Sequence, residues 1–432
     1  MIVGTDLEQD VKIPVSWYEA TALRGDANAP LQGHVDADIC VIGAGFAGLT
    51  TALELGRKGK RVVVLEASRI AAGASGRNGG FVSNGFALGF DGVVARAGEQ
   101  GALALYEFSK SGTEYIRTQI KLHCPDAFMG NGWRVAVRHD DRGGLKAYGE
   151  ALARKAGEDV QHSTAAETRL LLDSARYFDS LYFSHAFHIH PLKYALTLAR
   201  LCLQNNVSIF ENSKALAVEK DAGSTRVCTA NGEVVARDVL HCVSALDRTL
   251  HRPTGRALLP VATYVAVTEP LRQTVIKTSS AISDTRRAGD YYRLIDEGRI
   301  LWGGRITTRV SEPSRLAEAM KGDMISTYPQ LGNPRIDFTW AGLMGYALHK
   351  MPLIGRDHVG QWFATGFGGH GLNTTAMAGQ LIANAIADGD DAYRRFDVFA
   401  PEFAFGPLGR VGVQGSYWWM QARDRLDEVL KR

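Results

Sequence analysis

The sequence has few cysteines, and none of them is spaced as a pair. Five occur among the 432 residues, an odd number without a Cys-x-x-Cys motif. Small secreted domains usually carry an even and dense set, so this count favours reduced thiols and predicts a cytoplasmic protein. Cys40 lies in an apolar run and is interpreted as a small core residue.

An excess of one sign of charge and a long hydrophobic run are also missing. The 49 basic residues are balanced by 46 acidic ones, giving a net charge of +3, and no run of Lys and Arg occurs. A nucleic-acid partner is therefore not expected. The uncharged stretch of residues 39–53 is too short to span a bilayer and is interrupted by three glycines. We expect no membrane span and no signal peptide.

The rest of the composition is that of a globular protein. Apolar residues make up 45% of the chain and charged residues 22%, and 432 residues suffice for two domains. Glycine is abundant, with 47 residues, which predicts many turns or close backbone approaches.

The first glycine-rich segment lies between an apolar strand and a helix. Gly43, Gly45 and Gly48 complete G-x-G-x-x-G directly after the apolar residues 39–42, and a second apolar strand ends at Glu66. The glycines permit a tight turn, the approach of a pyrophosphate and close helix packing, while the acid can accept hydrogen bonds from a ribose. The sequence therefore predicts a dinucleotide site, and this fingerprint leaves NAD and FAD open.

A second glycine-rich segment follows shortly after Glu66. Residues 73–82 read GASGRNGGFV, with Arg77 and Asn78 among the glycines. Such backbone freedom favours close approach to a ligand, with the two side chains as fixed donors. The alternative for Arg77 is a surface salt bridge.

A third glycine-rich segment lies near the end of the chain. Residues 362–365 read as a strand, residues 366–371 are GFGGHG, and an apolar helix face follows up to residue 386. A helix that starts at such a loop can stabilise negative charge in front of its N-terminus.

The middle of the chain reads as short strands with turns between them. Asn231-Gly232 predicts a hairpin turn, and Asp296-Glu297-Gly298 a second turn. The pattern predicts an antiparallel sheet inserted into a βαβ framework. The expected strands are residues 214–219, 225–229, 234–235, 239–243, 264–268, 291–295 and 300–304.

With these residues in view, the chain resembles the D-amino-acid-oxidase superfamily of FAD-dependent amine oxidoreductases, over nearly its whole length. Within it, gamma-glutamylputrescine oxidases are the branch that it resembles most. The resemblance is carried by residues 62–80, HIHPL (188–192), DYYRL (290–294), MPLIGR (351–356) and GFGGHG (366–371). It implies an α/β fold in which a Rossmann-like FAD-binding domain is interleaved with an antiparallel β-sheet substrate domain.

The resemblance also implies a division of the chain. The C-terminal tail carries Trp418 and Trp419 and is expected to pack on the body or at a subunit contact rather than on a membrane surface. The expected parts are an N-terminal extension near the site entrance (1–35), a discontinuous FAD-binding domain (36–105, 186–258 and 340–390), a substrate domain (106–185 and 259–339) and the tail (391–432).

By the same resemblance, FAD contacts all three glycine-rich loops, the adenine-binding backbone at Val218 and the chain near the ribityl group at Ser244 and Ala245. No cysteine lies in or near the third loop, so we expect non-covalent FAD. The remaining expected FAD contacts are Gly43, Ala44, Gly45, Phe46, Ala47, Gly48, Glu66, Ala67, Ser68, Gly73, Ala74, Ser75, Arg77, Asn78, Gly79, Gly80, Gly368, Gly369, His370, Gly371, Leu372 and Asn373.

The chain departs from relatives that oxidise free amino acids. Such relatives hold the substrate carboxylate with a cation, but the corresponding positions here are Asn373, Met344 and residues 79–81. This favours an amine substrate without a carboxylate beside the reacting carbon. Arg305 is the one cation that could still serve, and its alternative is a solvated strand end.

A second departure concerns the electron acceptor. Leu301 stands where sarcosine-oxidase relatives carry a lysine implicated in oxygen activation. Either a protonated His370 assists oxygen, or oxygen is not the acceptor.

Other side chains are candidates for the catalytic pocket. Tyr292, Trp302 and Tyr346 are expected on the substrate side, with an aromatic core as the alternative, and His349 could accept a proton or cap a strand. No ligand set surrounds the histidines of residues 185–190, so no metal is expected.

The expected activity is an FAD-dependent oxidase that transfers hydride from the carbon next to an amine to the flavin. An imine and then an aldehyde would form, and oxygen would be reduced to hydrogen peroxide. One alternative is a dehydrogenase that passes electrons to a quinone or carrier protein. A different class is a flavin-binding interaction protein without turnover. An RNA-modifying relative is the least favoured, and the oligomeric state is left open.

Overall fold

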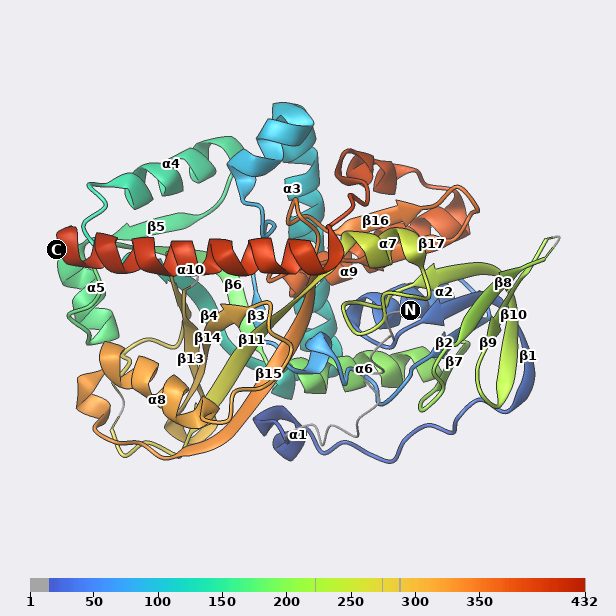
Figure 1. Cartoon of the computed structure of the whole chain (residues 1–432), viewed down its shortest axis with the longest axis horizontal. Helices are drawn as coiled ribbons and strands as arrows, with labels where there is room; N and C mark the ends of the chain where they lie inside the picture. The colour runs from blue at the N-terminus through green and yellow to red at the C-terminus, as the bar shows by residue number, and fades with distance from the viewer. Residues whose placement is uncertain (1–14, 222, 274, 287–288, 432) are drawn as a thin grey trace.

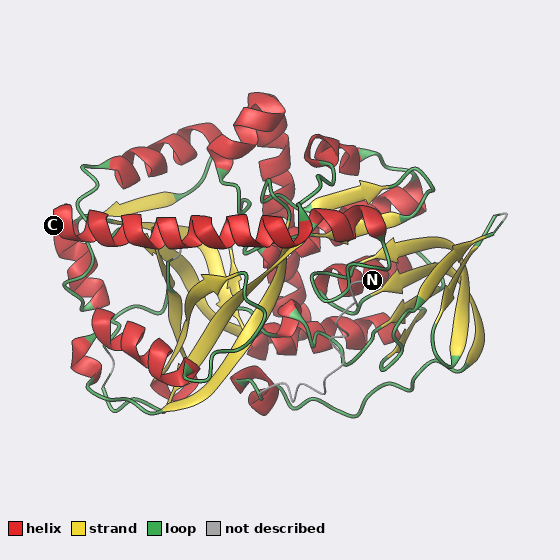
Figure 2. Ribbon diagram, viewed as in Figure 1, coloured by secondary structure: helices red, strands yellow, loops and turns green. Residues whose placement is uncertain are grey.

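The computed structural model describes residues 15–221, 223–273, 275–286 and 289–431. The first fourteen residues of the expected N-terminal extension lie outside this range. The described chain is organised around two β-sheets, with helices between and around them (Figures 1 and 2). This arrangement confirms the predicted α/β fold with an interleaved antiparallel sheet.

The first sheet is the nucleotide-binding type of sheet predicted from the first glycine segment. Its strands β7, β2, β1, β10 and β17 run parallel, β16 pairs antiparallel at one edge, and the hairpin β8–β9 attaches to β10. The bounds are β1 (Gly33–Ile42), β2 (Val62–Leu65), β7 (Val207–Phe210), β8 (Ala217–Lys220), β9 (Thr225–Cys228), β10 (Gly232–His241), β16 (Leu353–Arg356) and β17 (Trp362–Thr365).

Side-chain alternation along β1 shows why this sheet is buried on both faces. Ile39 and Val41 face the main core, whereas Cys40 and Ile42 face a smaller apolar cluster beneath the β8–β9 hairpin. Both faces therefore need apolar residues, which gives the continuous apolar run seen in the sequence. The helices of the main core include α2 (Phe46–Arg57), α3 (Phe90–His123), α6 (Pro191–Leu203) and α9 (Gly371–Asp388).

The second sheet is mostly antiparallel and runs in the order β15-β11-β14-β13-β12-β4-β6-β3, with β5 paired to β6. One of its faces joins the main core, and the other packs against α8 (Leu316–Thr327). Its strands are β3 (Phe81–Val82), β4 (Phe128–Ala136), β5 (Val160–Ser163), β6 (Ser180–Ile189), β11 (Leu259–Thr268), β12 (Ala281–Asp284), β13 (Tyr291–Ile295), β14 (Arg299–Thr307) and β15 (Ile336–Tyr346).

The predicted strands of the middle region are present, but some are longer or merged. Residues 234–235 and 239–243 were expected as two strands, and most of both belongs to the single ten-residue strand β10. The remaining helices are α1 (Trp17–Thr21), α4 (Gly144–Ala156), α5 (Ala165–Leu172), α7 (Arg252–Ala257) and α10 (Gly406–Leu430), with short 3-10 turns at Ala74–Gly76, Pro125–Ala127, Asp296–Gly298, Pro329–Leu331 and Ala392–Phe399.

Helix α10 crosses the front of the second sheet and ends at the C-terminus (Figure 1). It packs on the body of the protein, but Trp418 and Trp419 are 58% and 66% exposed. The two tryptophans therefore do not pack back on the rest of the described chain. Within the described residues, no helix is both long enough and apolar enough to cross a membrane.

Candidate functional site

The turn between β1 and α2 requires glycine at two positions. Gly43 has φ +108°, and a Cβ there would lie 3.1 Å from the carbonyl oxygen of Cys242. A Cβ at Gly48 would overlap the carbonyl oxygen of Gly43. The N-cap residue Gly45 offers no side-chain acceptor to the start of α2. The N-terminus of this helix can therefore present amide N–H groups to an anion.

Glu66 lies at the end of β2, beside this turn. Its Oε2 accepts a hydrogen bond from the amide of Ala44 (2.8 Å) and its Oε1 accepts one from the amide of Ser68 (3.0 Å). Burial raises the pKa of the Glu66 carboxyl, and the hydrogen bonds from backbone amides oppose this shift. Ser75 of the second loop accepts a hydrogen bond from the amide of Phe46 (3.0 Å), so the first two glycine loops are in direct contact.

Arg77 and Asn78 hold the second loop in place. Arg77 Nε donates to the carbonyl of Ala341 on β15 (2.8 Å), and Trp340 Nε1 donates to the carbonyl of Arg77 (2.9 Å). Asn78 Nδ2 donates to the carbonyls of Ala74 and Ser75, and its Oδ1 accepts from the amide of Gly80. These side chains were expected to be donors to the flavin, but the polar atoms named here serve the loop itself. A glycine-rich loop has little intrinsic order, so its side chains must supply it.

Tyr291 lies on the face of the second sheet that meets the second loop. A Cβ at Gly79 would lie 2.6 Å from Tyr291 Cε2, and a Cβ at Gly303, its partner across the β13–β14 pair, would overlap the ring. The ring of Phe81 meets it edge-on at 5.7 Å. The glycines therefore make the space that this ring occupies.

Tyr292 and Trp302 lie on the opposite face, away from the glycine loops. Their rings stack at 4.3 Å, and the hydroxyl of Tyr292 is 2.8 Å from those of Tyr177 and Tyr328. Both belong to the fully buried cluster under α8. This placement corrects the expectation that they line the substrate side, because consecutive strand residues point to opposite faces and Tyr291 takes the inner one.

Tyr346 ends β15 beside the third glycine loop. A Cβ at Gly368 would lie 2.9 Å from its ring, and a Cβ at Gly369 would collide with its hydroxyl. The amide of Gly368 donates to the carbonyl of Gly345 (3.1 Å), and Ser244 Oγ accepts from the amide of Gly345 (3.1 Å). The third loop, the end of β15 and the Ser244–Ala245 segment therefore meet at one place.

His370 and Asn373 stabilise the start of α9. His370 Nε2 is 3.1 Å from the carbonyls of both Ser83 and Asn84, so this nitrogen carries the proton and donates it. Burial lowers the pKa of His370, while its two carbonyl partners oppose that shift. A neutral imidazole is thus favoured over the protonated one expected to assist oxygen. Asn373 is buried, and its Nδ2 donates to the carbonyl of Gly85 (3.1 Å).

Arg305 and His349 are not brought to the glycine loops. Arg305 is paired with Asp323 of α8, through Nε at 2.5 Å and NH2 at 2.9 Å, and is half exposed. The solvated strand end is therefore the reading that the structure supports. His349 lies between β15 and β16, where its Nδ1 accepts from the amide of Met351 (3.1 Å) and its ring packs on Phe399. Burial lowers its pKa.

The HIHPL and DYYRL motifs, which carry part of the family resemblance, meet in the core. Arg293 of DYYRL donates to His188 Nδ1 (2.9 Å) and to the carbonyl of Ile189 (2.8 Å) of HIHPL. It also donates to the hydroxyl of Tyr18 (3.0 Å). Arg293 is fully buried, and a Cβ at Gly80 would collide with its guanidinium. These motifs therefore support the second loop from beneath.

The three glycine loops, Glu66 and the Ser244–Ala245 segment form one continuous region along the carboxyl ends of the first sheet. The start of α2, whose N-cap residue is a glycine without a side-chain acceptor, the glycine backbones and Glu66, an acid suited to a ribose, fit a dinucleotide cofactor. Val218 lies half-buried on β8, in the hairpin attached to that sheet. In the part of the chain described, no group of three or more His, Cys, Asp or Glu residues is placed to hold a metal.

Sequence reasoning missed Tyr291 as the aromatic residue that packs against the second glycine loop. The signal available was its register: Tyr291 pairs with Gly303, and an aromatic residue opposite glycine covers exposed backbone. The turn that sets this register was predicted at residues 296–298, but the pairing of Tyr291 with Gly303 was not drawn from it.

Comparison with known proteins identifies the family of the chain. The profile of the DAO family, described as FAD dependent oxidoreductase, matches residues 38–385. A "Probable oxidoreductase OrdL" of Haemophilus influenzae is 34% identical over 394 residues, covering 88% of this chain and 90% of that protein. The "Gamma-glutamylputrescine oxidoreductase" of Escherichia coli is 32% identical over 404 residues, covering 92% and 94% of the two chains.

Solved structures show the same fold. L-proline dehydrogenase from P. horikoshii superposes with a TM-score of 0.70 at 19% identity, covering 86% of this chain and all of that one. Glycine oxidase from Bacillus cereus gives 0.69 at 18% identity, covering 84% and 98%. The match to the family model and the two curated relatives confirm the predicted FAD cofactor and oxidoreductase class. The chain belongs to the DAO family of FAD-dependent oxidoreductases.

Proposed function

We propose that the protein oxidises primary or secondary amines that lack a carboxylate beside the reacting carbon, with gamma-glutamylputrescine as the first candidate substrate. The amine loses two electrons and two protons to become an imine. Water hydrolyses the imine to an aldehyde and ammonia or a smaller amine, and oxygen is reduced to hydrogen peroxide. The three glycine loops and Glu66 would hold FAD without a covalent link, and the cofactor would supply the acceptor for the hydride on the carbon next to the nitrogen.

The observation that carries this proposal is the neutral character of the positions where a carboxylate anchor is expected. Asn373 is buried and engaged with the carbonyl of Gly85. Residues 79 and 80 are glycines packed on Tyr291 and Arg293, and Arg305 is paired with Asp323 on α8. A substrate carboxylate would lack the charge-assisted hydrogen bonds that hold it in amino-acid oxidases.

The aromatic side chains at the site suit an amine. Tyr291 and Tyr346 lie half-buried against glycine backbone, and an aromatic ring face suits an alkyl amine or ammonium group. Burial raises the pKa of both phenols, and a hydrogen bond with Thr263 moderates this for Tyr291. Both stay protonated at neutral pH and cannot act as bases. The reactive substrate is therefore the neutral amine, which the apolar surroundings favour over the ammonium form.

A second candidate, an amine dehydrogenase with another electron acceptor, is favoured by one residue. Leu301 is fully buried in the main core, at the position where the lysine implicated in oxygen activation was expected. The relative that is named L-proline dehydrogenase shows that this fold also occurs in dehydrogenases.

The test is anaerobic titration of the purified holoenzyme with gamma-glutamylputrescine, followed by a panel of other amines. We expect loss of the flavin band at about 450 nm. L-Glutamate, whose amine lies beside a carboxylate, is the matched control and should leave the band unchanged. Bleaching by L-glutamate alone, or by no compound, would contradict the proposal.

The acceptor is tested by mixing the reduced enzyme with oxygen in a stopped-flow instrument. Rapid return of the flavin band with stoichiometric hydrogen peroxide supports the oxidase. Slow return, together with rapid electron transfer to a soluble quinone, would favour the dehydrogenase instead.

A further inference from the structure

Helix α10 is a part of the molecule that the function above does not yet use. It spans Gly406–Leu430, beyond residue 385 at which the match to the family profile ends. In Figure 1 it runs across the front of the second sheet. Its contacts show that both ends are fixed to that sheet.

The N-terminal half of α10 is tied to the end of β14. Gln414 Oε1 accepts hydrogen bonds from the hydroxyl of Thr307 (2.8 Å) and the amide of Thr308 (2.9 Å). Arg410 NH2 donates to the carbonyl of Thr308 (2.8 Å). A Cβ at Gly409 would lie 3.4 Å from the side chain of Leu259, the β11 residue that pairs with Tyr346. This half of α10 therefore lies close to the end of β15.

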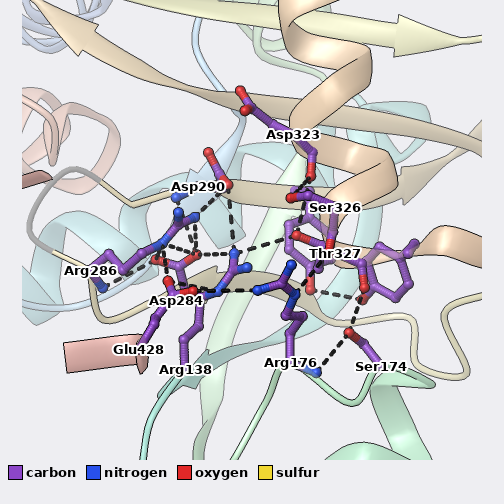
Figure 3. A network of polar contacts seen from close by, with 12 residues as sticks. Arg138, Ser174, Arg176, Asp284, Arg286, Asp290, Asp323, Ser326, Thr327 and Glu428 are labelled. Carbon is purple, nitrogen blue, oxygen red and sulfur yellow. Dashed lines mark hydrogen bonds and ion pairs between the residues drawn. The ribbon is translucent and has the colours of Figure 1, made fainter. Parts of the chain in front are cut away.

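The C-terminal half is tied to a network of charged side chains, shown in Figure 3. Glu428 approaches Arg138 (3.4 Å), Arg176 (3.7 Å) and Arg286 (3.9 Å). Arg286 in turn pairs with Asp284 and with Asp290, the residue directly before Tyr291. Buried groups of this kind tolerate few alternative positions, so the network fixes the helix in one register.

Tyr417 lies between these two attachments and on the same face of the helix. It follows Gln414 by three residues and precedes Glu428 by eleven, which is the spacing of residues on one helical face. It is half-buried, whereas its neighbours Trp418 and Trp419 are exposed. Burial is the main cause that raises the pKa of the Tyr346 phenol, and the nearby Tyr417 adds to this shift. Burial also raises the pKa of Tyr417 to about 12.

We infer that Tyr417 is a specificity-determining residue and that α10 forms the outer wall of the amine site, in contact with the part of the substrate beyond the oxidised carbon. This inference rests on the proposed amine oxidation. Tyr346, at the end of β15, packs against the third glycine loop, and Tyr417 extends the same aromatic surface outward from a helix that is held at both ends. A long amine reaches this surface, whereas a short one ends before it.

The experiment compares Tyr417→Ala with Trp418→Ala in the holoenzyme. The two residues are adjacent, but the tryptophan faces outward, so it is the matched control. Anaerobic flavin reduction gives a dissociation constant and a limiting rate for gamma-glutamylputrescine and for propylamine. We expect Tyr417→Ala to weaken the long amine roughly tenfold and propylamine less than about twofold, with little change in limiting rate. Trp418→Ala should leave both unchanged.

Tyr417→Leu keeps an apolar side chain without the ring and decides the question if the alanine variant does not fold. It must also weaken the long amine selectively, with FAD content and melting temperature near those of the parent. Suppose that the amines reduce the parent enzyme, but Tyr417→Leu and Trp418→Ala have equal dissociation constants for the long amine. That result would overturn this inference and leave the proposed function standing. Failure of the parent enzyme to be reduced by any amine would overturn both.

Discussion

The two faces of the second sheet are built from the same residue types in different ways. On the inner face, the rings of Tyr291 and Tyr346 lie against glycines. On the outer face, Tyr292 and Trp302 lie against other rings, and the phenol of Tyr292 is bonded to two further phenols. Aromatic rings packed on rings form a core, whereas a ring packed on glycine backbone occupies space that another side chain would otherwise fill. The difference teaches that glycine positions, more than aromatic positions, mark the site.

The largest expected effect comes from removing the space beside Tyr291. In Gly303→Ala the new methyl group would overlap the ring, so the ring must move from the inner face. We expect overpacking to cost about 1–3 kcal/mol and the rate of anaerobic flavin reduction to fall at least roughly tenfold. Gly322→Ala is the control, because open space surrounds that position on α8. Normal reduction kinetics in Gly303→Ala would show that the inner face does not shape the site.

A smaller effect is expected from substituting Asp290, which lies directly before β13. Burial raises its pKa to about 6, against the opposing influence of Arg286. A carboxyl whose folded pKa is raised binds more protons when folded, so its contribution to stability is present at low pH and is lost as pH rises from about 4 to 6. Between these pH values the free energy of unfolding should fall by about 1–3 kcal/mol less in Asp290→Asn than in the parent. Denaturant unfolding at several pH values measures this difference. Parallel pH profiles for parent and variant would contradict this assignment.

The outer face should affect stability without affecting catalysis. Tyr292→Phe removes the hydroxyl shared with Tyr177 and Tyr328 and should lower the free energy of unfolding by about 1 kcal/mol. Flavin reduction by amines should be unchanged. A changed dissociation constant for the amine would place Tyr292 back in the pocket and break the comparison between the faces.

The smallest expected effect concerns the hydroxyl of Tyr346. Because the ring provides the contact with the third glycine loop, Tyr346→Phe should change amine binding less than about threefold, whereas Tyr346→Ala should weaken it about tenfold. Steady-state kinetics with a panel of amines measures both. Equal losses in the two variants would assign the binding to the hydroxyl.

The sequence was sufficient for the parts of the site that depend on backbone geometry. The turn at Gly43 and Gly48 needs glycine for local reasons, so its motif predicted the strand, the helix and the acid at Glu66. Side-chain roles were harder to predict. Tyr291 and Tyr292 are adjacent, and only the register with Gly303 decides which one faces the loops. Arg77 was recognised as part of the second glycine loop, but its bond to Ala341 depends on a residue 264 positions away.

Helix α10 could not be located from the sequence either. Its conspicuous residues, Trp418 and Trp419, drew attention to the outward face, while the less conspicuous Gln414, Tyr417 and Glu428 face the protein. These contacts join residues more than a hundred positions apart, and no local pattern encodes them. The substrate-domain division and the individual contacts to FAD remain predictions.

The interleaving of the two sheets has a consequence for how the chain is made. The pairing of β1 with β10 joins Gly33 to Gly232, and β17 completes the parallel strands only at residues 362–365. The buried hydrogen bonds of Arg293 likewise need Tyr18 and His188. The ribosome must therefore release most of the polypeptide before either sheet can close. The many long-range pairings slow folding. The edges of β1 and β2 stay unpaired until the partner strands later in the chain have been synthesised.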